Sequence, residues 1–198
     1  MILLIAALLT PLAGFAPPLT PVGLSVSDVS GSGCAKGSAA AAMSADNSAF
    51  TITYSAFLAQ AGPGTKPADG RRSCRITLAV TPPAGTRYAV SSVDYRGFAH
   101  LSPGAGSRHR ANYHFESGGA PDKITHTIAG PLDDNWSATD VVGAGKKVPS
   151  PCGKKHNLRI DTDLEVDAEP GAQSVSFLAI DSTDGSGSST YRLDWQPC

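Results

Sequence analysis

Carboxylates at every second position from residue 161 to 167 are the pattern in this sequence that comes closest to a chemical site. The stretch "RIDTDLEVD" places Asp161, Asp163, Glu165 and Asp167 in alternation with mostly apolar residues. In an extended strand, residues two apart lie on one face about 6.6–7 Å from each other, so neighbouring carboxylates could share a Ca²⁺ ion. Asp161, Asp163 and Glu165 are therefore weak candidates for calcium ligands. The competing interpretation is a solvated face whose charges protect a sheet edge.

Calcium is the only cofactor that the sequence leaves open. It usually takes six to eight oxygen ligands, so the strand would need further ligands from the loop that contains Asp181 and Asp184. The spacing in that loop is not that of an EF-hand. The histidines form no H-x-H or H-E-x-x-H motif, and His114 and His126 are expected on opposite faces of their strands. We therefore expect no metal site built from histidine.

Arg96, within "VDYRGF", is a candidate ligand contact. Tyr88 and Val90 share one parity, whereas Val93 and Tyr95 share the other, so a β-bulge near residues 91–92 is needed for all four to face the core. Asp94 and Arg96 would then lie together on the outer face, close enough to form an ion pair. The alternative is that Arg96, with Tyr95 or Phe98, contacts a ligand.

Trp136, in "PLDDNWSATD", is the second candidate ligand contact. It lies in an apparent loop, and an exposed aromatic ring can stack on the face of a sugar. Trp195, by contrast, is expected in the core. Asn135, Trp136 and Ser137 also form an N-glycosylation sequon, which is meaningful if the source is eukaryotic.

The sequence predicts no catalytic residue. The chain has no G-x-S-x-G motif, and an all-β chain offers no strand-turn-helix to hold one. A glycan-active hydrolase would need two facing carboxylates in a cleft, which sequence alone does not reveal. Such a small secreted hydrolase remains the alternative to a binding protein.

The elements that must position these residues are predicted to be strands. Apolar and polar residues alternate with a period of two in segments such as "AFTITY", "CRITLAV" and "TYRLDW", and Gly- and Pro-rich turns separate them. With 198 residues and 41% hydrophobic content, the chain suits one domain. We predict an all-β fold: a single antiparallel, jelly-roll-like β-sandwich over residues 31–198. Residues 38–45 fit a short helix or an edge strand.

The N-terminus indicates export from the cytosol. Residues 2–9 form an apolar run of the length of a secretory signal, too short to span a membrane. We expect a signal peptide at residues 1–16 and a Pro/Ser/Gly-rich leader at 17–30, although a buried strand or helix is the alternative for the apolar run. The formal net charge of −1 argues against nucleic acid as a partner. We expect a secreted, extracellular monomer.

The four cysteines agree with an oxidising environment, because they are even in number and include no C-x-x-C pair. We favour the pairing Cys34–Cys74 with Cys152–Cys198. Loops of that size would stabilise the protein by about 4 kcal/mol each in the chain-entropy model. The pairing Cys34–Cys198 with Cys74–Cys152 stays open.

Five stretches together resemble a known family: "VDYRGFAHLSPG", "FLAQAGPGT", "RRSCRITL", "SPCGKKHNLRIDTDL" and "YRLDWQPC". In their order along the chain, and with all four cysteines, they are similar to the secreted fungal and bacterial proteins catalogued as domain of unknown function 4360. The resemblance implies a small, secreted, disulfide-bonded, β-rich protein and transfers no catalytic residue. The acidic run after "SPCG" departs from the family pattern. We expect a non-catalytic extracellular or cell-surface protein that binds a glycan or another protein.

Overall fold

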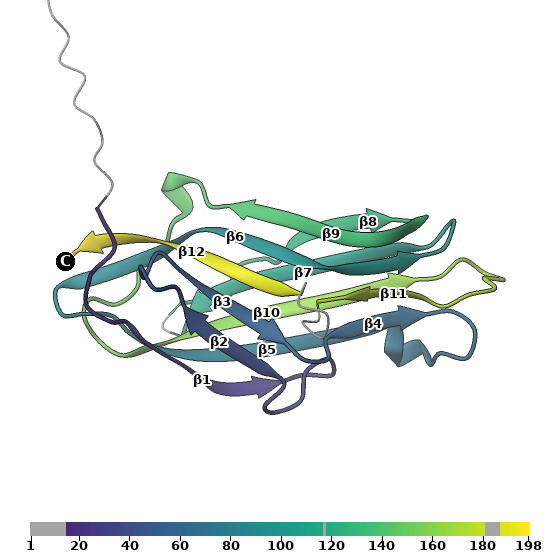
Figure 1. Cartoon of the computed structure of the whole chain (residues 1–198), viewed down its shortest axis with the longest axis horizontal. Coiled ribbons are helices and arrows are strands. Elements are labelled where there is room, and N and C mark those ends of the chain that lie inside the picture. Colours follow the sequence, from purple (N-terminus) through teal and green to yellow (C-terminus); the bar gives the residue numbers. More distant parts are fainter. Residues whose placement is uncertain (1–14, 117, 181–186) are drawn as a thin grey trace, which may run out of the picture.

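The structure is a computed structural model that describes residues 15–116, 118–180 and 187–198. Two antiparallel sheets pack face to face in it, and the strands of both run along the long axis of the molecule (Figure 1). The predicted antiparallel β-sandwich is confirmed. Short 3₁₀ helices at Pro67–Gly70 (η1) and Ala144–Lys146 (η2) interrupt the loops.

The sheets have five and seven strands. The five-stranded sheet has the order β1 (Gly23–Ser30), β5 (Arg71–Thr81), β10 (His156–Asp167), β7 (Gly106–Phe115) and β8 (Ile124–Ala129). The seven-stranded sheet has the order β2 (Ala39–Met43), β3 (Ala49–Tyr54), β12 (Ser188–Pro197), β6 (Thr86–Leu101), β11 (Ser176–Ala179) and β4 (Leu58–Ala61). Its last strand, β9 (Leu132–Val141), pairs with the long β6.

The core lies between the two sheets and follows the alternation in the sequence. In β5 the buried side chains include Ile76 and Leu78, and in β12 of the other sheet they include Tyr191 and Trp195. Removing such side chains from water is the main force that holds the layers together, at about 25 cal/mol per Å² of apolar surface. The period of two thus decides which face of each strand turns inward.

A β-bulge lies where the parity of β6 changes. Arg192 of β12 pairs with Ser92, but the next residue, Leu193, pairs with Val90, so Ser91 has no partner in β12. The predicted bulge near residues 91–92 is confirmed. It lets Val90 and Tyr95 both point into the core, and it sets which face Arg96 occupies.

The N-terminal boundary of the domain lies earlier than the sequence suggested. Residues 23–30, assigned above to a leader, form β1, which pairs with β5. The predicted start of the domain at residue 31 is therefore wrong. Polar residues alternate along β1, as they do in an edge strand, so in the sequence this segment resembles a linker. The expected signal peptide lies, up to residue 14, outside the described residues. Residues 39–43 form the edge strand β2 and not a helix.

Two disulfides crosslink the sandwich. Cys34 pairs with Cys74, and Cys152 pairs with Cys198, with Cα–Cα separations of 5.3 and 6.0 Å. This is the pairing favoured from the spacing. The first bridge fastens the segment after β1 to β5, and the second fastens the C-terminus to the loop before β10. None of the helices in the described residues is long and apolar enough to cross a membrane.

Candidate functional site

The predicted carboxylates lie on the central strand of the five-stranded sheet. β10 is flanked by β5 and β7 over most of its length, so its outward face is not at a sheet edge. Asp161 forms an ion pair with Arg75 at 2.6 Å, and Asp163 forms one with Lys123 at 2.7 Å. The expectation of a solvated, edge-protecting face is therefore wrong: Asp161 is buried, and basic side chains from neighbouring segments cover the acids.

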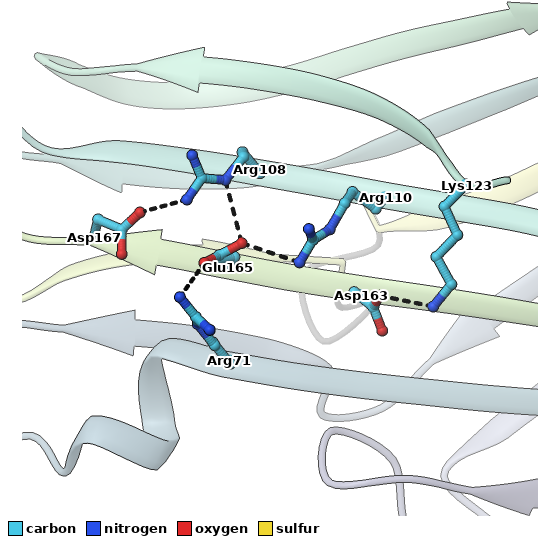
Figure 2. Close-up of polar contacts among 7 residues, drawn as sticks. All are labelled: Arg71, Arg108, Arg110, Lys123, Asp163, Glu165 and Asp167. Carbon is cyan, nitrogen blue, oxygen red and sulfur yellow. Dashed lines mark hydrogen bonds and ion pairs between the residues drawn. The ribbon is translucent and has the colours of Figure 1, made fainter.

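Glu165 is the centre of this charged face (Figure 2). Its carboxylate lies 2.8 Å from Arg71 of β5, and 3.2 and 3.0 Å from Arg108 and Arg110 of β7. The side chain of Glu165 is only 5% exposed. The hydrogen bond from Arg108 is the main reason that the pKa of Glu165 is lowered, and burial acts in the opposite direction. The arrangement fastens three strands together.

These contacts give the weak calcium candidates a structural role. A cation at Asp161, Asp163 or Glu165 would have to displace an arginine or lysine that already compensates each charge. The described residues contain no cluster of three or more Asp, Glu, His or Cys side chains arranged to hold a metal ion. Asp181 and Asp184, the expected additional ligands, lie outside the described residues.

Arg96 is on the solvent side of the seven-stranded sheet, but it does not pair with Asp94. Asp94 binds Arg192 at 3.0 Å and accepts a hydrogen bond from Thr139, so the predicted Asp94–Arg96 ion pair is wrong. β12 lies beside β6 and brings Arg192 within ion-pair distance of Asp94. Arg96 is exposed and forms no ion pair within the described residues.

Trp136 is not in a loop. It lies in β9, is only 6% exposed, and donates a hydrogen bond from Nε1 to the Ala179 carbonyl at 3.2 Å. Gly97 is its partner in β6, and a Cβ there would overlap the Ala179 carbonyl and come within 2.8 Å of Trp136 Nε1. The indole thus occupies space beside Gly97 that a side chain at that position would fill. The prediction of Trp136 as an exposed ligand contact is wrong.

Three aromatic side chains form a row beside Arg96, which we call the aromatic strip: Phe98, His100 and Phe177. The Phe98 and Phe177 ring centroids are 6.0 Å apart and those of His100 and Phe177 are 5.7 Å apart, with interplanar angles of 28° and 23°. All three are partly exposed. They alternate with core residues of β6 and β11, two strands that lie side by side in Figure 1.

Polar side chains border the aromatic strip on the β9 side. His100 Nδ1 lies 3.0 Å from Asp133 Oδ1, and the Asp133 side chain is 70% exposed. Asn135 pairs with Phe98 across the two strands and is exposed. With Arg96 two residues before Phe98, the strip is surrounded by a guanidinium, an amide and a carboxylate. This surface combines ring faces with hydrogen-bonding groups.

A second polar cluster, between the sheets, was missed by the sequence analysis. Asp140 of β9 accepts a hydrogen bond from the Tyr95 hydroxyl at 3.1 Å, and its other oxygen lies 2.8 Å from His126 Nε2. The His126 ring stacks on the fully buried His109. Burial, followed by the nearby His126, lowers the pKa of His109 to about 3.

The alternation of inward and outward residues along β7 could have revealed this cluster. His109 shares the inward parity of Ala111, which pairs with Ile124 of β8. The strand register therefore places His109, and not His114, opposite His126. That register depends on where the loop between the two strands turns, which the alternation pattern does not specify.

Comparison with a curated relative agrees with the export of this chain. It is 29% identical over 168 residues to an uncharacterized secreted protein of Arthroderma benhamiae, a match that covers 85% of this chain and 68% of that protein. Among solved structures, TmCBM61 in complex with β-1,4-galactotriose is similar over 89% of this chain and 87% of that chain, at 11% identity and a TM-score of 0.29. The enzymatically active domain of bacteriophage CBA120 tailspike protein 4 is similar over 91% and 20%, at 10% identity and a TM-score of 0.25.

The chain is thus a secreted, disulfide-stabilised β-sandwich protein. A family model described as a domain of unknown function, DUF4360, matches residues 21–198, which include every strand of both sheets. The protein belongs to the DUF4360 family.

Proposed function

We propose that this protein is a non-catalytic extracellular protein that binds glycans through the aromatic strip. The observation that carries the proposal is the near-parallel row of Phe98, Phe177 and His100 on the solvent side of the seven-stranded sheet. Partly exposed aromatic rings gathered on one face of a soluble protein mark an interaction surface more often than isolated apolar residues do.

The chemistry around the rings suits a sugar. The C–H faces of a pyranose are apolar and pack on aromatic rings, while its hydroxyls need hydrogen-bond donors and acceptors close by. Arg96 supplies donors, Asp133 supplies acceptors and Asn135 supplies both. Because these groups are exposed and lie along one sheet face, the surface suits an extended chain of sugars.

Carboxylate contacts favour this role over the alternative of a hydrolase. Each acid from Asp161 to Asp167 on β10 forms an ion pair with an arginine or lysine. Asp140 is engaged by Tyr95 and His126. A glycosidase needs two carboxyl groups facing each other across a substrate, one of them protonated. A carboxyl group beside an arginine favours its ionised form and is therefore a poor proton donor.

Glycan-array binding of the purified protein tests the proposal, with Phe177→Ala and Arg96→Ala as the variants. Loss of an aromatic or arginine contact at the centre of a binding surface typically weakens affinity about tenfold or more. Arg71→Ala is the matched control, because Arg71 is 75% exposed on the opposite sheet and Glu165 keeps Arg108 and Arg110. Binding that the strip variants leave unchanged would contradict the proposal, as would no binding to any glycan.

A further inference from the structure

A pocket of about 510 Å³ opens between the two sheets, away from the aromatic strip. Its walls come from the end of β7, from residues 118–122 and the start of β8 that follow it, from Tyr95 of β6, from the end of β9 and from the loop that follows β9. A volume of this size is typical of sites for small molecules. No residue of the aromatic strip or of its polar border lines the pocket, so an inference from it does not depend on glycan binding.

Exposed apolar residues gather around this pocket. Five large hydrophobic side chains of the described residues are exposed, and three of them, Ile124, Val141 and Val148, line the pocket. Tyr113 and Phe115 form further parts of the wall. Concentrating exposed apolar surface at one concave place costs solubility, which indicates a surface that is covered in use. The ligand that fits such walls has an apolar body.

Asp140 contributes a buried carboxylate to the pocket. Its side chain is 6% exposed, and within the described residues its one ion-pair partner is the imidazole of His126. The pocket lining includes two carboxylates, Asp122 and Asp140, and one lysine, Lys146, which leaves a formal charge of −1 when histidine is neutral. No arginine belongs to the described lining. The charge of the pocket therefore complements a cation.

Tyrosine rings strengthen this preference. Tyr95 and Tyr113 both line the pocket, and the Tyr95 hydroxyl donates a hydrogen bond to Asp140. Burial, followed by the charge of Asp140, raises the pKa of Tyr113 to about 12, so its ring stays neutral at physiological pH. A neutral phenol ring attracts a cation above its face, and the attraction grows when water is excluded.

We propose that this pocket binds an organic cation with an apolar body: an ammonium group lies near Asp140 and the Tyr113 ring, and the apolar part contacts Val141 and Val148. The burial cost of a charged carboxylate is reduced when a ligand brings the opposite charge to it. The buried acid and the exposed apolar residues are separate features of one pocket, and a hydrophobic ammonium compound satisfies both.

The test compares three benzyl compounds by isothermal titration calorimetry on the whole secreted protein: benzyltrimethylammonium, benzyl alcohol and benzoate. We expect benzyltrimethylammonium to bind about tenfold more tightly than neutral benzyl alcohol, and benzoate to bind most weakly. Equal affinities for the cation and the neutral compound would overturn the proposal. This comparison uses only the wild-type protein, so it does not depend on any variant folding.

Variants locate the cation. Asp140→Asn should abolish the preference for benzyltrimethylammonium over benzyl alcohol, whereas Asp133→Asn, which removes an exposed carboxylate of the same strand, should preserve it. Tyr113→Leu should weaken binding of the cation, and Tyr113→Phe, which keeps a ring, should retain it. A preference that survives in folded Asp140→Asn would overturn the site. Glycan binding is measured on Asp140→Asn and Tyr113→Leu, and its persistence in both would show that the two sites are independent.

Discussion

His126 Nε2 lies 2.8 Å from Asp140 Oδ1, and this contact joins the two sheets at the edge where β8 and β9 meet. β8 is the last strand of the five-stranded sheet, and β9 lies outermost beside β6 in the other. Because Tyr95 donates to the second oxygen of Asp140, the same carboxylate connects β6, β8 and β9. The contact also lies beside the pocket that Asp140 lines.

Replacing His126 should loosen this edge. His126→Ala leaves one oxygen of the buried Asp140 without its partner, so we expect the free energy of unfolding to fall by about 1–3 kcal/mol. Urea denaturation followed by tryptophan fluorescence measures it. His100→Ala is the matched control, since His100 and its partner Asp133 are 40% and 70% exposed and such pairs contribute little. Equal losses in the two variants would contradict the role of the His126–Asp140 contact.

The arginines around Glu165 should make stability fall in acid. The folded state lowers the pKa of Glu165, so its contribution is complete above the unfolded pKa and is lost as the pH falls through the folded one. Glu165→Gln should therefore reduce stability at neutral pH by about 1–3 kcal/mol and reduce the slope of stability with pH below the ordinary pKa of a glutamate. Denaturation midpoints across this pH range measure both effects.

Asp167→Asn provides the comparison for Glu165→Gln. Asp167 is 59% exposed and pairs with Arg108 alone among the described residues. Its replacement should change the free energy of unfolding at neutral pH by no more than a few tenths of a kcal/mol. It should also leave the dependence of that free energy on pH unchanged. If the stability of Glu165→Gln follows the same pH dependence as that of the wild type, the ion pairs of Glu165 with β5 and β7 contribute nothing to folding.

Gly97 should tolerate no side chain. In Gly97→Ala the new Cβ would collide with the Ala179 carbonyl and the Trp136 indole, and forcing β6 and β11 apart should cost about 3 kcal/mol. Thermal unfolding measures the loss. Gly143→Ala is the control, because a Cβ at Gly143 meets no atom within 4 Å. A Gly97→Ala protein as stable as Gly143→Ala would contradict the packing described here.

Each disulfide should stabilise the folded protein, because the loop that it closes restricts the unfolded chain. The sequence separations are 40 and 46 residues, for which the chain-entropy model gives about 4 kcal/mol each. The double replacements Cys34→Ala/Cys74→Ala and Cys152→Ala/Cys198→Ala should therefore lower the free energy of unfolding by similar amounts. The oxidised wild-type protein should also weigh four hydrogens less than the reduced one. Reaction of the native protein with a thiol reagent would contradict both expectations.

Alternation predicted the strands well, because burial between two layers imposes a period of two on almost every segment. Ile76 and Leu78 of β5 show the pattern clearly. The change of parity between Val90 and Val93 even located the bulge at Ser91, since only an extra residue turns both to the core. Cysteine spacing indicated the disulfide pairing for a different reason: in the favoured pairing each bridge joins cysteines that are neighbours along the chain.

Strand neighbours were not predictable in the same way. Asp161 and Glu165 look like an exposed acidic edge until Arg75 and Arg108, distant in sequence, are placed on the flanking strands. Trp136 was mistaken for a loop residue because β9 is an outer strand whose outward residues are polar. Its inward position follows only from pairing with Gly97. Cross-strand contacts depend on strand order, and alternation carries no information on order.

The position of Asn135 affects how any binding measurement on this protein is made. Asn135, the acceptor of the sequon, is exposed directly opposite Phe98. A eukaryotic expression host that modifies this asparagine would attach a bulky oligosaccharide over the rings, and the proposed surface would be masked by the preparation itself. Material from bacterial periplasm, or an Asn135→Gln version from yeast, leaves that side of the sheet uncovered.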